Sequence, residues 1–79
     1  MKYVVYGRDA CQSCKDAVAL LKAKNIEYEY KSFGKDYTIS KFQEINKAHK
    51  SFPMITVVEN DTETYIGGLH QLQQILGGG

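Results

Sequence analysis

Both cysteines of this 79-residue chain fall in one short unit, Cys-Gln-Ser-Cys at residues 11–14. A chain of this size lies near the lower limit at which an apolar core is stable without cross-links, and secreted proteins this short spread several cysteines along the sequence to supply them. A bridge between Cys11 and Cys14 would close too short a loop to add much stability. We therefore expect one domain, residues 1–79, whose cysteines do chemistry.

The first third of the chain reads as a strand, a helix and a second strand. Residues 2–6 are β-branched or aromatic except for Lys2 and end at Gly7, which predicts a buried strand. Residues 12–24 are rich in helix formers, with their apolar side chains spaced to share one face, and Asn25 is the expected stop. Residues 26–32 alternate as a half-buried strand does. A parallel β-α-β unit follows from this order.

The rest of the chain predicts a helix, a hairpin and a last helix. Residues 38–50 have helical apolar spacing, with Thr38 or Asp36 as the cap. Residues 52–58 and 63–66 form a hairpin around turn residues 59–62, and the only proline, Pro53, opens its first strand. Residues 69–76 form a short helix that frays into 77–79. The order β-α-β-α-β-β-α predicts an α/β, thioredoxin-like fold with a four-stranded mixed sheet and helices on its faces.

Charge and hydropathy narrow the range of partners. Ten basic and nine acidic residues leave a net charge of +1, which is not the balance of a protein that binds nucleic acid or an acidic membrane. The apolar run at the N-terminus is too short for a signal sequence or a membrane span. We expect a monomer that works in the cytoplasm.

A Cys-x-x-Cys unit between a strand and a helix has a specific chemical logic. Unpaired backbone N–H groups and the helix dipole stabilise a thiolate at the helix start, so Cys11 is the expected nucleophile. Cys14, one turn further in, would attack the mixed disulfide that Cys11 forms. Arg8 and Lys15 add positive charge nearby, and Asp9 opposes them.

Zinc binding is the rival interpretation, because the chain also holds His49 and His70. Zinc fingers place their two histidines a few residues apart, whereas these two lie in different segments of the chain. We therefore predict that the two histidines do not bind zinc and that the chain holds no metal.

Three features in order carry a family resemblance: residues 8–14 directly after the first strand, the Phe52-Pro53 step and the Gly67-Gly68 pair. With these features the whole chain resembles the short dithiol glutaredoxins of bacteria and their phages. The resemblance implies a thiol-disulfide oxidoreductase that uses glutathione as its reductant and acts on disulfide-bearing proteins. Cys11 and Cys14 would be its catalytic residues.

The resemblance also implies binding roles. Pro53 matches the family's cis-proline, which faces the dithiol and leaves the backbone of Phe52 free to pair with a substrate. Lys50 and Arg8 stand where the family has basic residues, of which the first meets a glutathione carboxylate. The other implied binding residues are Gln12, Ser13, Gly67, Gly68, His70 and Gln71.

Three departures from the family pattern matter. Residues 12–13 replace the usual Pro-Tyr, and residues 51–52 replace Thr-Val and add a bulky ring. After Gly68, where the family has an aspartate for the γ-glutamyl end of glutathione, this chain has Leu69, His70 and Gln71. We therefore expect weaker glutathione binding, which Gln71 compensates only in part.

Two other functions remain open on the sequence alone. One is a glutaredoxin-like redoxin that thioredoxin reductase reduces and that donates electrons to ribonucleotide reductase. The other is an iron-sulfur or zinc module that uses Cys11.

Overall fold

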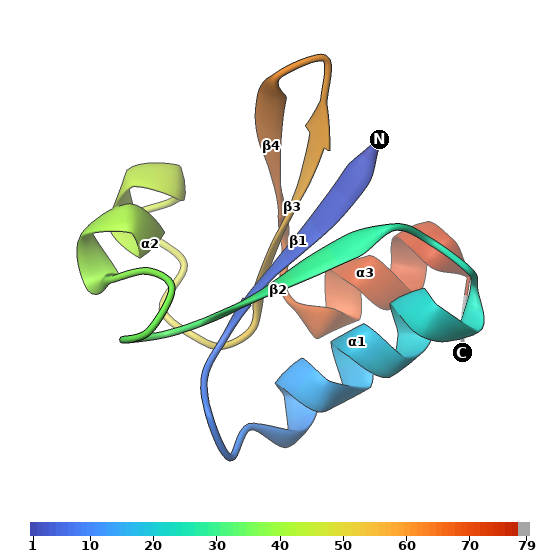
Figure 1. Cartoon of the computed structure of the whole chain (residues 1–79), viewed down its shortest axis with the longest axis horizontal. Helices are drawn as coiled ribbons and strands as arrows, with labels where there is room; N and C mark the ends of the chain where they lie inside the picture. The colour runs from blue at the N-terminus through green and yellow to red at the C-terminus, as the bar shows by residue number, and fades with distance from the viewer. Residues whose placement is uncertain (78–79) are drawn as a thin grey trace.

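The computed structural model describes residues 1–77 and has the predicted order of elements. The elements are β1 (Lys2–Gly7), α1 (Gln12–Ala23), β2 (Tyr28–Ser32), α2 (Ile39–Ile45), β3 (Met54–Glu59), β4 (Thr62–Gly67) and α3 (Leu69–Leu76). The strands form one sheet in the order β2-β1-β3-β4, in which β1 and β2 are parallel and the other pairs antiparallel. Figure 1 shows α1 and α3 side by side, with α2 apart from them. The predicted α/β fold with a mixed sheet is confirmed.

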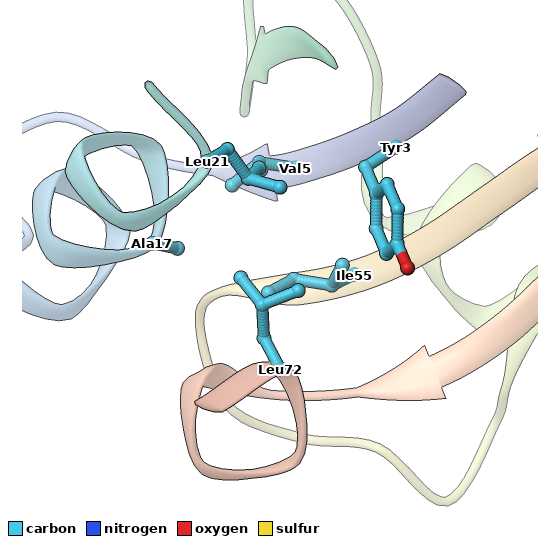
Figure 2. Close-up of a cluster of buried hydrophobic side chains, with 6 residues drawn as sticks. All are labelled: Tyr3, Val5, Ala17, Leu21, Ile55 and Leu72. Carbon is cyan, nitrogen blue, oxygen red and sulfur yellow. The ribbon is translucent and has the colours of Figure 1, made fainter. Parts of the chain in front are cut away.

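The sheet alternates its side chains between two cores, as the pleat of a strand requires. Figure 2 shows the first core, where Tyr3 and Val5 of β1 meet Leu21 of α1 and Leu72 of α3. Leu21 and Leu72 are fully buried. This core fixes α1 and α3 against the sheet. The site described below lies at the starts of these two helices.

The second core lies on the face of the sheet against which α2 packs, and a polar group, described below, lies at its edge. Val4, Tyr6 and Met54 pack there with Tyr37 and Phe42.

A carboxylate of β4 ties three strands together at the edge of this second core. Oε2 of Glu63 accepts hydrogen bonds from the hydroxyls of Tyr6 (2.6 Å) and Thr56 (2.7 Å). Burial acts to raise the pKa of Glu63, but these two donors and the cations Lys41 and Lys31 outweigh it and lower that pKa. Because the pKa is lowered in the folded chain, Glu63 stabilises the fold above the ordinary glutamate range, and this contribution is lost as pH falls through the folded pKa.

The second helix is shorter than the predicted range 38–50, because it ends at Ile45. Oδ1 of Asn46 accepts a hydrogen bond from the backbone N–H of Ala48 (2.9 Å), a local turn that competes with helix continuation. Thr38 is the N-cap but makes no side-chain capping bond, while Asp36 instead accepts from the backbone of Ser32 (2.8 Å). Strands β2 and β3 also begin two residues later than predicted, at Tyr28 and Met54.

The helices are all short. None of those within residues 1–77 combines the length and the apolar composition that crossing a bilayer requires. The last helix ends at Leu76, and Gly77 follows in the left-handed conformation (φ 65°) that glycine adopts without strain. The fraying expected at residues 78–79 lies outside the described part of the chain.

We expect Leu72→Ala to lower the free energy of unfolding by about 2–5 kcal/mol, because it opens a cavity in the first core. Ile75→Ala, on the same helix but 54% exposed, should change it by less than about 1 kcal/mol. Urea unfolding followed by circular dichroism measures both. Equal losses would mean that α3 is not held through Leu72.

Candidate active site

Cys11 lies at the junction between β1 and α1, where it is the N-cap residue of the helix. Its backbone is extended, and the preceding Ala10 turns the chain with a positive φ of 56°. The Sγ of Cys11 accepts a hydrogen bond from the backbone N–H of Cys14 (3.3 Å), one of the donors that a helix start leaves unpaired. The same donor would stabilise negative charge on that sulfur.

Cys14 lies one turn further along α1 and faces the core. Its side chain is 1% exposed, against 8% for Cys11, and both cysteines are free thiols. Burial, followed by the hydrogen bond with Cys11, raises the pKa of Cys14 to about 12. At neutral pH Cys14 is therefore a protonated thiol held beside Cys11.

The end of β1 holds the two cysteines in place. A side chain at Gly7 would bring a Cβ within 2.9 Å of the Sγ of Cys14, so glycine lets α1 approach the strand. The hydroxyl of Tyr37 donates to the carbonyl of Gly7 (2.9 Å), and that of Tyr30 donates to the carbonyl of Arg8 (3.1 Å). Burial raises the pKa of Tyr37 and of Tyr30, which keeps both as donors.

Six of the predicted binding residues line one hollow of about 370 Å³ beside α3, here called the α3 cavity. They come from the start of α1, the loop before β3 and the start of α3. They are Ser13, Phe52, Pro53, Gly68, His70 and Gln71. The peptide bond between Phe52 and Pro53 is cis, as the resemblance implied.

Sequence reasoning missed His49 and Tyr65, which also line the α3 cavity. The Nε2 of His49 lies 3.3 Å from the carbonyl oxygen of Pro53, which can only accept, so this nitrogen carries a proton. In the neutral ring Nδ1 is then the acceptor, and the hydroxyl of Tyr65 donates to it (2.6 Å). The early end of α2 at Ile45 leaves His49 in the irregular segment before β3, which contributes His49, Ser51, Phe52 and Pro53 to the cavity lining.

Two basic residues of the predicted set lie near Phe52. The ring of Phe52 packs against Phe33 and Phe42, and the guanidinium of Arg8 lies 5.5 Å from its centroid. Lys50 lines a hollow of about 290 Å³ together with Phe52. Neither Arg8 nor Lys50 lines the α3 cavity.

The glycine pair directly precedes α3, and its second residue, Gly68, lines the α3 cavity. Gly67 has a φ of 143°, and a Cβ there would come within 2.9 Å of the side chain of Gln71. The Oε1 of Gln71 accepts a hydrogen bond from the backbone N–H of Gly68 (2.9 Å) and so caps α3. His70 is exposed, with its Nε2 3.3 Å from the amide nitrogen of Gln74. The oxygen of Gln71 is therefore already engaged within the chain.

Three predicted binding residues in the described chain line neither of these two hollows: Arg8, Gln12 and Gly67. The amide of Gln12 donates to Asp16 on the outer side of α1 (2.8 Å). Gln12 is exposed to solvent and follows Cys11 in the sequence, so a large partner can reach it.

Two solved glutaredoxin structures share this fold over nearly their whole length. Glutaredoxin 1 from Francisella tularensis, complexed with cacodylate, is 25% identical with a TM-score of 0.68, and the match covers 96% of each chain. Reduced Escherichia coli glutaredoxin is 24% identical with a TM-score of 0.69, and the match covers 98% of this chain and 94% of that one. This chain is glutaredoxin-like. No protein-family model and no curated protein matches its sequence.

The glutaredoxin-like fold and the Cys-x-x-Cys pair support a thiol-disulfide oxidoreductase. The site offers one sulfur at a helix start, in a residue that is 8% exposed, and a second, protonated sulfur behind it, which is the arrangement that disulfide exchange needs. Within residues 1–77, no three His, Cys, Asp or Glu side chains gather closely enough to hold a metal ion.

We expect iodoacetamide near pH 7.5 to modify Cys11 before Cys14, because the raised pKa of Cys14 keeps its thiol protonated and its side chain is buried. Mass spectrometry with peptide mapping measures the order of labelling. In urea the two cysteines should react at similar rates, which is the control. Faster labelling of Cys14 in the folded chain would contradict this account of the site.

Proposed function

We propose that this chain reduces protein disulfides and glutathione mixed disulfides through Cys11 and Cys14, with glutathione as the reductant, as a monomer in the cytoplasm. The observation that carries the proposal is the division between the two sulfurs. Cys11 accepts a hydrogen bond at the start of α1, while Cys14 is buried one turn behind it with its pKa raised to about 12.

The reaction begins when the Cys11 thiolate attacks one sulfur of a substrate disulfide. A mixed disulfide forms between Cys11 and the substrate, and the other substrate sulfur leaves as a thiolate. Cys14 then loses its proton and attacks the Cys11 sulfur, which releases the second substrate thiolate and forms the Cys11–Cys14 disulfide. Two molecules of reduced glutathione restore the dithiol and leave as oxidised glutathione.

The loop before β3 supports this proposal, because it lines the α3 cavity together with Ser13 of the dithiol segment. A substrate backbone would pair with Phe52 there, as the resemblance implies. Lys50 lines the neighbouring hollow with Phe52 and Arg8 contacts its ring, and both supply positive charge for a carboxylate.

Thioredoxin reductase is the alternative electron donor, with ribonucleotide reductase as an acceptor. One observation favours it: no carboxylate lines the described α3 cavity, and the oxygen of Gln71 is already bonded to Gly68. The glutathione amino group would therefore find few acceptors there. NADPH consumption with glutathione plus glutathione reductase, or with thioredoxin reductase alone, separates the two donors.

We expect Cys11→Ser to abolish all disulfide reduction, because no mixed disulfide can form without that thiolate. Cys14→Ser should retain turnover of a glutathionylated peptide, since glutathione itself can resolve the Cys11 adduct, but it should lose reduction that depends on an internal disulfide. The coupled NADPH assay measures both variants. Equal residual activity on the glutathionylated peptide would overturn the assignment of the nucleophile.

We expect His70→Asp to lower the KM for a glutathionylated peptide roughly 3- to 10-fold, because a carboxylate in the α3 cavity would accept from the ligand's amino group. The exposed position of His70 leaves the fold intact. His70→Asn is the matched control, since asparagine has the shape of aspartate without its charge. If both variants lower KM alike, or neither does, the γ-glutamyl end is held elsewhere.

A further inference from the structure

A second hollow, which we call the α1–β2 groove, begins at the loop before Cys11 and lies between α1 and the edge strand β2. Its volume is about 530 Å³, within the range of sites that hold ligands or side chains of a partner. Val18, Ala19 and Tyr28 give it an apolar floor, and it shares no lining residue with the α3 cavity. It is thus separate from the α3 cavity, and Arg8 is the one residue proposed for glutathione binding that also lines it.

Three cations surround this apolar floor: Arg8, Lys15 and Lys22. Within residues 1–77 none of them lies within 4.0 Å of a carboxylate, whereas Lys2 and Lys41 do form ion pairs. The groove's one lining carboxylate in the described chain belongs to Asp9. The groove therefore presents an uncompensated positive charge beside the dithiol.

The sequence of α1 explains where the two lysines of the groove lie. Lys15 and Lys22 stand at positions i and i+7 with Val18 and Ala19 between them, so one helix stripe carries a cation at each end of an apolar patch. The core-facing stripe of the same helix holds Cys14, so the cationic stripe is the outer one. At about 1.5 Å of rise per residue the two lysines are about 10 Å apart along the helix axis. An extended chain covers that distance in about three residues.

We infer that the α1–β2 groove binds an acidic, extended segment of the protein whose disulfide this chain reduces. Acidic side chains about three residues apart would meet Lys15 and Lys22, an apolar side chain between them would lie on the floor, and the substrate cysteine would lie at the Cys11 end beside Arg8. The inference rests on the proposed disulfide reduction and adds to it the class of substrate.

The test compares two synthetic peptides, each linked to an identical copy through its single cysteine so that attack on either sulfur attaches the peptide to Cys11. One peptide has glutamates about three residues apart on both sides of the cysteine, and the other has glutamines in their place. Hydroxyethyl disulfide, which has no side chains, is the reference substrate. We expect kcat/KM about 5-fold higher for the glutamate peptide at low salt, and a smaller ratio at about 0.5 M salt.

Lys22→Glu should lower kcat/KM for the glutamate peptide about 5-fold and leave the glutamine peptide and hydroxyethyl disulfide unchanged. Lys24→Glu is the matched control, because it makes the same charge change at the same end of α1 at a residue outside the groove, and it should alter no substrate. Equal turnover of the two peptides, or equal effects of the two variants, would overturn the inference. If the unmodified chain did not reduce hydroxyethyl disulfide at all, that result would instead contradict the proposed function.

Discussion

The site depends on the contact between Gly7 at the end of β1 and Cys14 at the start of α1. A Cβ at Gly7 would come within 2.9 Å of the Cys14 sulfur, so the close approach of helix and strand needs a residue without a side chain. That approach buries Cys14 and leaves Cys11 at the helix start with a backbone donor 3.3 Å from its sulfur. The two sulfurs therefore differ in burial because of backbone packing. The Cys-x-x-Cys motif alone does not set this difference.

Two surfaces of different chemistry adjoin this dithiol. The α3 cavity is lined by hydroxyls, imidazoles and an amide, with His49 fixed between Tyr65 and the carbonyl of Pro53. The α1–β2 groove is apolar with a cationic rim. On the proposals above, a small thiol and a protein substrate would be recognised on different faces, with Arg8 as the one residue assigned to both.

Periodic segments made most of this fold predictable from sequence. The β-branched and aromatic run of β1, the alternation of β2 and the apolar stripe of α1 follow directly from strand and helix geometry, and the order of elements came with them. The end of α2 was predicted wrongly, because no glycine or proline interrupts residues 46–50, while the side chain of Asn46 closes a turn with Ala48. Local hydrogen bonding ends the helix there.

The same limit applies to the site. Cys11 and Cys14 could be selected from their spacing and position alone, whereas His49 could not, because its partner Tyr65 comes from another segment, strand β4. Contacts between segments depend on the register of β3 and β4, which a single sequence specifies only indirectly. The binding residues after Gly68 were proposed from the resemblance, and their roles await experiment.

The central claim is that Cys11 and Cys14 exchange electrons as a pair. The most direct measurement equilibrates the reduced chain with mixtures of reduced and oxidised glutathione, quenches with acid, and follows intact mass and peptide maps. The account predicts one transition in which the chain loses two hydrogens and gains a Cys11–Cys14 disulfide, as expected for a two-electron couple. Stable glutathione adducts on both cysteines, without that disulfide at any ratio, would contradict it.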